Sequence, residues 1–270
     1  MSFEQSGPAW LFCPADRPDR FEKAAAVADV VILDLEDAVA AADKQSARAA
    51  LVDTPLDPAR TVVRINPVGT ADHALDLEAL SRTSYTTVML PKCESAQHVC
   101  GLAPLEVVVL VESPPGAVNV AQCVQPDNTV GVMWGAEDLF AALGGTANRR
   151  ADGTYRDVAV HVRSASLLAA KAFGRLALDS VYLDIKDLDG LRAEVDDAVA
   201  VGFDAKVAIH PSQVPVIRTG YTPDADQMRW ARRVLAAAQN QRGVFELDGV
   251  MIDMPVLRRA QRILRLAPQD

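Results

Sequence analysis

Four cysteines, Cys13, Cys93, Cys100 and Cys123, are few for 270 residues, and no two of them form a C-x-x-C pair. Neither a zinc knuckle nor a redox pair is therefore predicted, and reduced thiols are expected. The chain also lacks any block of lysine or arginine and carries a formal charge of -9. An acidic chain is repelled by phosphate backbones, so we expect no nucleic-acid partner.

Long apolar segments are missing as well. No apolar run approaches the roughly 20 residues that cross a bilayer, so no membrane association is expected. Residues 1–6 carry neither the basic stretch nor the apolar stretch of a secretory signal. These absences lead us to expect a cytoplasmic protein.

The chain instead repeats one pattern: a short apolar segment, a polar or charged residue, and then a helix-compatible segment. The clearest example runs from Glu106 to Glu112, with five apolar residues between the two acids and Pro114-Pro115 after them. So short an apolar run predicts a strand that is buried on both faces. Eight such strands are predicted, at 9–13, 30–35, 61–65, 87–91, 106–112, 129–134, 180–185 and 205–210.

Alanine-rich segments separate these strands, and helices are predicted at 18–28, 43–51, 71–82, 157–176 and 191–201. Alternating strands and helices over a chain of this length predict an α/β fold, a (β/α)8 TIM barrel. An open doubly wound sheet would show the same alternation, but no G-x-G-x-x-G motif follows a strand to support it. Two further helices, predicted at 223–240 and 254–266, form a C-terminal helical extension.

We therefore divide the chain into a catalytic barrel domain, residues 1–220, and the helical extension, residues 221–270. The extension is short for an independent domain and is expected to pack on its own barrel or on that of a neighbouring subunit. One barrel connection is unusually long and contains the polar, glycine-bearing segment 144–153. Such a segment beside a site is either a lid or binding loop, or a merely mobile surface loop.

Two carboxylates stand at the ends of neighbouring predicted strands, Glu112 after the fifth and Asp138 after the sixth. Neighbouring barrel strands would bring both to the same rim. Two carboxylates without a histidine or cysteine beside them favour a hard cation, Mg²⁺ or else Mn²⁺, whose other ligands are water and substrate. The alternative for Asp138 is the N-cap of a helix.

Arg64 ends the third predicted strand, and an arginine in an apolar strand needs an anion nearby. The anion would be either a substrate carboxylate or an internal partner among Asp34, Glu36 and Asp37. Those three acids end the second strand and could orient Arg64, hold a metal-bound water or cap the next helix. Lys92, which follows the fourth strand, could contact an anion or form a Schiff base.

A set of short motifs also occurs along the chain, each of them weak alone. In chain order they are Phe12-x-Pro14-x-x-Arg17-Pro18, Ile32-Leu33-Asp34-Leu35-Glu36-Asp37, Val63-Arg64-Ile65-Asn66, Leu90-Pro91-Lys92, Val111-Glu112-Ser113-Pro114, Trp134-Gly135-Ala136-Glu137-Asp138, His210-Pro211-Ser212-Gln213 and Asp248-Gly249-x-Met251-Ile252-Asp253. In this ordered set the chain resembles the β-subunit of citrate lyase and its stand-alone relatives, within the malyl-CoA and citramalyl-CoA lyase (HpcH/HpaI aldolase) superfamily. The resemblance covers nearly the whole chain.

The resemblance implies a (β/α)8 barrel, a homo-oligomer that is often a trimer, and a magnesium site whose protein ligands are Glu112 and Asp138. It also implies that a C-terminal aspartate reaches the site from a neighbouring subunit. Asp253 is the matching residue, and Asp248 is the other candidate.

Further roles follow from the same resemblance. The catalytic group would comprise Asp253, Arg64, Glu36 and Asp37. The substrate would be bound by Arg64, Glu112, Lys92, Gly135 and Ala136, and the coenzyme A phosphates would lie near Arg17, Arg20 and Lys23. Two departures matter: Pro14-Ala15-Asp16 replaces the usual Pro-Gly, so the backbone beside the acyl-CoA differs, and the short chain favours a stand-alone enzyme.

These interpretations predict a Mg²⁺-dependent carbon–carbon lyase that cleaves a β-hydroxyacyl-CoA to acetyl-CoA and a keto acid. The citramalyl, malyl, citryl and hydroxymethylglutaryl thioesters all present a β-hydroxyl and a carboxylate, so the pattern does not choose among them. Three alternatives stay open: an aldolase acting on free hydroxy-keto acids, a malate-synthase-like condensation, and a catalytically silent barrel within a larger complex.

Overall fold

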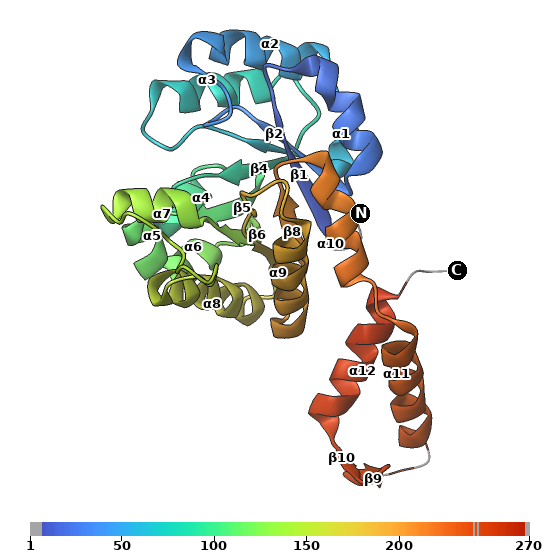
Figure 1. The fold of residues 1–270 in the computed structure, drawn as a ribbon. Coiled ribbons are helices and arrows are strands. Elements are labelled where there is room, and N and C mark those ends of the chain that lie inside the picture. Colours follow the sequence, from blue (N-terminus) through green and yellow to red (C-terminus); the bar gives the residue numbers. More distant parts are fainter. Residues whose placement is uncertain (1–6, 240, 242, 268–270) are drawn as a thin grey trace. The chain divides into compact units, whose positions relative to one another are not determined.

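The chain divides into two compact units, one ending at Ile217 and one beginning at Arg218. The structure, a computed structural model, describes residues 7–239, 241 and 243–267, and Figure 1 labels most of their helices and strands. Within these ranges no helix is long and apolar enough to cross a membrane. All four cysteines are free thiols, as their spacing predicted.

The first unit is a closed barrel of parallel strands, in which each strand pairs with the next and β1 pairs with β8. The strands are β1 (Ala9–Pro14), β2 (Val30–Asp34), β3 (Thr61–Arg64), β4 (Thr87–Leu90), β5 (Glu106–Val111), β6 (Thr129–Trp134), β7 (Leu176–Asp179) and β8 (Ala205–Ala208). The predicted (β/α)8 TIM barrel is therefore confirmed.

Alternate residues of the strands fill the barrel interior, because successive side chains of a strand point to opposite faces. The interior cluster includes Trp10, Ile32, Val62, Met89, Val108, Leu110, Met133, Leu178 and Val207. β5 shows why the strands form: every residue after Glu106 is buried. A filled interior leaves chemistry to the rim, where the strands end and the loops begin.

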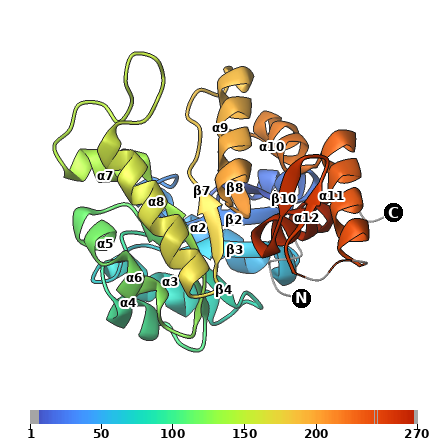
Figure 2. The same cartoon turned by 90° about the horizontal axis from the view of Figure 1, so that it is seen from below.

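Helices follow the strands of the barrel along the chain. They are α1 (Phe21–Val27), α2 (Lys44–Asp53), α3 (Ala71–Leu80), α4 (Ala96–Cys100), α5 (Pro114–Val118), α6 (Val120–Val124), α7 (Ala136–Ala142), α8 (Asp157–Ala172), α9 (Leu188–Val201) and α10 (Val214–Tyr221). Short 3-10 helices lie at Pro18–Arg20, Ala41–Asp43, Pro58–Arg60 and Pro211–Gln213. Seen from below, α8 runs beside β7 (Figure 2).

One predicted strand was wrong: residues 180–185 are not a strand, and β7 is Leu176–Asp179 instead. The predicted helix at 157–176 had absorbed the start of β7, because leucine and alanine favour helix. In the structure α8 ends at Ala172, and Gly174 adopts a positive φ of 65° that turns the chain. Pairing of β7 with β6 then outweighs the local helix propensity.

The second unit is a small helical unit with its own core. Helix α11 (Ala225–Ala238) is followed by a hairpin of β9 (Phe245–Leu247) and β10 (Val250–Ile252), and then by α12 (Met254–Leu266). The buried residues that form this core are Ala231, Val234, Ile252 and Ala260. The predicted C-terminal helical extension is confirmed, and a hairpin connects its two helices.

Candidate active site

The carboxyl ends of β2 to β6 bring together most of the residues predicted to form the site. Glu36 and Asp37 follow β2, Arg64 is the last residue of β3, Lys92 follows β4, Glu112 follows β5, and Asp138 lies in the first turn of α7. Asp138 is thus neither at the strand end nor at the N-cap, which is Gly135. Because parallel barrel strands share one rim, residues distant in sequence become neighbours here.

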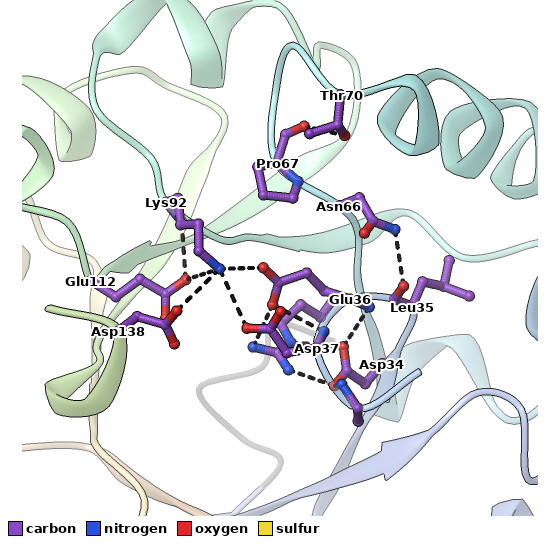
Figure 3. Close-up of polar contacts among 12 residues, drawn as sticks. Asp34, Leu35, Glu36, Asp37, Asn66, Pro67, Thr70, Lys92, Glu112 and Asp138 are labelled. Atoms are coloured by element: carbon purple, nitrogen blue, oxygen red, sulfur yellow. Dashed lines mark hydrogen bonds and ion pairs between the residues drawn. The ribbon is translucent and has the colours of Figure 1, made fainter. Parts of the chain in front are cut away.

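The ammonium group of Lys92 lies at the centre of this cluster. Figure 3 shows it between Glu112 and Asp138 on one side and Glu36 and Asp37 on the other. Its Nζ is hydrogen-bonded to Glu36 and lies 3.4 Å from Asp37 Oδ2, 3.4 Å from Asp138 Oδ1 and 3.8 Å from Glu112 Oε1. Four carboxylates therefore surround one position that is suited to a cation.

The backbone of Lys92 is itself unusual. Its φ of 50° lies in the left-handed region, which costs about 1–3 kcal/mol for a residue other than glycine. In this conformation the Lys92 N–H donates to Glu112 Oε1 at 3.1 Å. The strained turn thus directs both the ammonium and the amide of one residue at the acid cluster.

Arg64 has internal partners on all three of its nitrogens. Nε and Nη2 donate to Asp34 at 2.8 and 2.5 Å, and Nη1 lies 2.9 Å from Glu36 Oε2. Burial by itself would lower the pKa of Arg64, but the Asp34 and Glu36 carboxylates outweigh burial. The pKa of Arg64 is therefore raised above its ordinary value, and the guanidinium stays charged. The internal ion pair weighed for this residue is present. A guanidinium has five N–H donors, so these contacts leave donors for a substrate.

Asp34 is the residue that the predicted set of site residues missed. It is fully buried, and its carboxylate also accepts from the backbone N–H of Glu36 at 2.8 Å and of Ala38 at 3.2 Å. It therefore fixes both Arg64 and the loop that carries Glu36. Its position at the end of an apolar strand, like that of Arg64, was the available signal.

Lys44 also holds the Glu36 loop, and it was not predicted either. Its Nζ donates to the carbonyl oxygens of Leu35 at 2.8 Å and Glu36 at 3.0 Å, and to Asn66 Oδ1 at 2.7 Å. Asn66 in turn donates to Leu35 O at 2.9 Å. No sequence pattern indicated Lys44, because it lies in α2 and reaches the loop only in the folded chain.

Glu112 is 4% exposed, and its environment disfavours a bare negative charge. Burial and the neighbouring Asp138 carboxylate raise the pKa of Glu112 to about 8, although Lys92 opposes the shift. The absence of a side chain at Gly135 makes room for it, since a Cβ there would stand 2.9 Å from Glu112 Oε2. Ala136, the next residue, is buried. A divalent cation would relieve the electrostatic cost of ionising Glu112.

The donors at this rim fit a magnesium ion. Within the described ranges no group of three or more His, Cys, Asp or Glu side chains is arranged to hold a metal. Mg²⁺ is commonly held by one or two carboxylates, with water and substrate completing its shell. Glu112 and Asp138 offer such a pair of oxygen donors, and the nearby Lys92 ammonium marks a position already stabilised for positive charge.

The remaining predicted residues lie away from this cluster in the chain. Arg17, Arg20 and Lys23 are exposed on the segment that follows the carboxyl end of β1, and Arg17 pairs with Asp19 at 3.4 Å. Asp253 belongs to the second unit, where its Oδ1 caps α12 by accepting from Val256 N at 3.1 Å. Their roles toward coenzyme A and in catalysis stay predictions.

Asp248 forms the turn of the hairpin in the second unit together with Gly249. Its φ of 52° and that of Gly249, 77°, are the positive values that a tight hairpin turn needs. Its carboxylate pairs with Arg233. Asp248 therefore shapes the turn, whereas one oxygen of Asp253 is engaged in capping.

The chain is similar to known proteins along most of its length. The model of the HpcH/HpaI aldolase/citrate lyase family matches residues 9–211. A citrate lyase subunit beta-like protein of Mycobacterium tuberculosis is 64% identical over 99% of this chain and 98% of its own. The mitochondrial citramalyl-CoA lyase of Rattus norvegicus is 31% identical over 96% of this chain and 85% of its own.

A solved structure extends the likeness to three dimensions. The crystal structure of CitE from Mycobacterium tuberculosis in complex with magnesium, acetoacetate and coenzyme A has a TM-score of 0.95 and 64% identity. The match covers 98% of this chain and 99% of the CitE chain. The ordered motifs, the closed barrel and these matches together show that the chain belongs to the HpcH/HpaI aldolase/citrate lyase family.

Proposed function

We propose that this member of a lyase family is a Mg²⁺-dependent carbon–carbon lyase that cleaves a β-hydroxyacyl-CoA to acetyl-CoA and a keto acid. The observation that carries the proposal is the cluster of Glu36, Asp37, Glu112 and Asp138 around the Lys92 ammonium at the barrel rim, with Glu112 and Asp138 together on one side of it. The similar CitE protein, whose crystal structure contains magnesium, acetoacetate and coenzyme A, supports both the metal and the thioester.

Glu112 and Asp138 would hold the magnesium ion. When bound, the metal acts as a Lewis acid toward the hydroxyl and carboxylate of the acyl group and lowers the hydroxyl pKa. Arg64 would orient that carboxylate through its remaining N–H donors. Asp34 and Glu36 hold the guanidinium rigidly, and a fixed donor aligns the breaking bond.

Proton transfers would fall to carboxylates that are not metal ligands. Glu36 and Asp37 lie at the same rim, and we assign them the proton of the β-hydroxyl, taken directly or through a water. As that proton leaves, the bond between the α and β carbons breaks, its electron pair stays on the thioester fragment, and the hydroxyl carbon becomes a keto group. Asp253 would then protonate the α carbon of the acetyl-CoA enolate.

The second unit is suited to serve another copy of the chain in a homo-oligomer, which we propose is a trimer. Residues 218–270 contain 9 Lys+Arg and 6 Asp+Glu and so carry +3, while residues 1–217, with the remaining 18 and 30, carry -12. Opposite charges favour association of the unit with a barrel. Around the hairpin Val250, Met251 and Met254 are more than half exposed, which is typical of an interaction surface next to Asp253.

A substrate screen tests the proposed function. Purified protein would be mixed with citramalyl-, malyl-, citryl- and hydroxymethylglutaryl-CoA and with the free acids, with Mg²⁺ or EDTA, while acetyl-CoA, free coenzyme A and keto acid are measured. We expect acetyl-CoA and keto acid to appear in equal amounts from one thioester, only with metal. Cleavage of free acids alone would indicate an aldolase, and no turnover would indicate a silent barrel.

Coenzyme A binding gives a separate prediction. Replacing Arg17, Arg20 and Lys23 together with alanine should raise KM for the acyl-CoA by about tenfold to a hundredfold, because the three side chains are exposed and each exposed ion pair contributes about 0.5–1 kcal/mol. The kcat should stay near normal, since the lost contacts bind ground state and transition state alike.

The control is Arg82→Ala, because Arg82 is exposed on the segment before β4, at the opposite end of the barrel. An unchanged KM in the triple variant would place the phosphates elsewhere. A kcat that falls together with the folded fraction would instead show that the segment supports the barrel.

A further inference from the structure

The connection between α7 and α8, expected to be a lid or a mobile loop, is a small hairpin in the structure. Arg149 and Tyr155 form an antiparallel bridge. Arg150 N donates to Thr154 O at 2.8 Å, and Arg156 N donates to Asn148 O at 2.9 Å. We call residues 148–156 the α7–α8 hairpin. Its internal hydrogen bonds hold its two arms together.

Arg149 anchors the α7–α8 hairpin to the barrel wall. Its Nη1 donates to Gly153 O at 2.9 Å within the hairpin and to Glu194 Oε1 of α9 at 2.5 Å. Its guanidinium lies 3.8 Å above the ring centroid of Tyr155 and 5.2 Å from that of Tyr182. Ion pairing and stacking on two rings together make this a specific site for arginine.

The anchor ends in a rigid part of the barrel. Glu194 Oε2 lies 3.3 Å from Lys206 Nζ, which is fully buried and also contacts Asp179 Oδ2 at 3.1 Å and Ser180 O at 2.8 Å. Tyr155 packs edge-on against Trp134, with ring centroids 5.1 Å apart. The hairpin is therefore held at its Arg149 side by groups whose own positions are fixed by burial.

The other side of the hairpin holds the helix that carries Asp138. Asn148 Nδ2 donates to Glu137 Oε1 at 2.5 Å, and Glu137 immediately precedes Asp138. Helix α7 has only seven residues, and its N-cap, Gly135, provides no side-chain cap. A helix this short is marginal by itself, so its neighbours decide its orientation. The Asp138 side chain is 36% exposed and is not held by burial.

We propose that Arg149 is a positioning residue for the metal site. It acts through Glu194 and the α7–α8 hairpin to hold α7 and so places the Asp138 carboxylate beside that of Glu112. The proposal rests on the proposed function, since it takes Asp138 as a metal ligand. It predicts that loss of the Arg149–Glu194 ion pair weakens magnesium binding while leaving the chemistry of the loaded site intact.

The test measures Mg²⁺ affinity by titration calorimetry and kcat at saturating Mg²⁺ for the unmodified protein and three variants: Arg149→Met, Glu194→Gln and the double variant. We expect each single variant to bind Mg²⁺ about tenfold more weakly, the range seen when residues behind a ligand are changed. The double variant should bind no more weakly than Arg149→Met, because Glu194 acts on the metal site through Arg149. At saturating Mg²⁺ the kcat should recover to within about twofold.

The matched control is Arg150→Met in the same hairpin, whose side chain contacts Tyr155 O and the exposed Asp157 and should leave Mg²⁺ affinity unchanged. A merely structural role would lower the folded fraction and kcat without shifting Mg²⁺ affinity, and this result would overturn the proposal. Unchanged affinity in Arg149→Met, or additive losses in the double variant, would do the same. Failure of the unmodified protein to bind Mg²⁺ would instead overturn the proposed function and the positioning role with it.

Discussion

Glu112→Gln should lower kcat/KM for the acyl-CoA by about a thousandfold at Mg²⁺ concentrations that saturate the unmodified protein, because a metal that stabilises transition-state charge contributes several kcal/mol. The amide keeps the volume of the side chain but removes the charge that holds the cation. The fold should persist, because Glu112 is only 4% exposed and a neutral amide is easier to bury than a carboxylate. Calorimetric titration with Mg²⁺ should show no binding at concentrations that saturate the unmodified protein.

The control for this substitution lies on the same strand. Glu106→Gln changes an exposed acid at the opposite end of β5 and should leave both Mg²⁺ affinity and kcat/KM within about twofold, as surface substitutions usually do. Asp138→Asn should reproduce the loss seen with Glu112→Gln. Near-normal, EDTA-sensitive activity in both Glu112→Gln and Asp138→Asn would show that the metal is held elsewhere.

Asp179→Asn should lower the free energy of unfolding by about 3–5 kcal/mol, the usual cost of breaking a buried ion pair from one side. Asp179 is 2% exposed and accepts from Trp134 Nε1 at 2.8 Å, from Arg163 Nε at 3.0 Å and from Lys206 Nζ at 3.1 Å. Without its charge, the fully buried Lys206 loses its nearest carboxylate. Denaturant unfolding should show the loss, and thermal unfolding should show a Tm lower by about 10 °C.

The same side chain predicts a pH dependence. Burial alone would raise the pKa of Asp179, but Lys206 and Arg163 outweigh it and hold the pKa below its usual value. A lowered folded-state pKa contributes stability above the unfolded pKa of about 3.9, and that contribution is lost as the pH falls through the folded-state pKa. The difference between the unmodified protein and Asp179→Asn should therefore be constant above about pH 5 and shrink in acid.

Asp197→Asn is the matched control for this second substitution. Asp197 also pairs with Arg163, at 2.6 Å, but its side chain is 58% exposed. Water screens such a pair, and we expect a loss of no more than about 1 kcal/mol. If Asp197→Asn and Asp179→Asn destabilise the chain equally, burial is not the reason for the role of Asp179.

The sequence determined the barrel and the rim on which the candidate site lies. Apolar segments too short for buried helices predict strands, and polar residues directly after them predict a common edge, because parallel strands of a closed barrel end at one rim. Arg64, Lys92 and Glu112 were placed at that rim by this argument alone. The order and spacing of the motifs predicted the family to which the chain belongs, and the comparisons confirm it.

Only the tertiary structure decided which side chains are partners. Nothing in the sequence shows that Asp34 takes two nitrogens of Arg64, that Lys92 stands among four carboxylates, or that Arg149 reaches Glu194 on α9. Likewise, local helix propensity predicted a helix at the start of β7, and only the pairing of β7 with β6 makes it a strand. Periodicity records whether each residue is buried or exposed, whereas ion pairs depend on strand register and on burial, which brings distant charges together out of water.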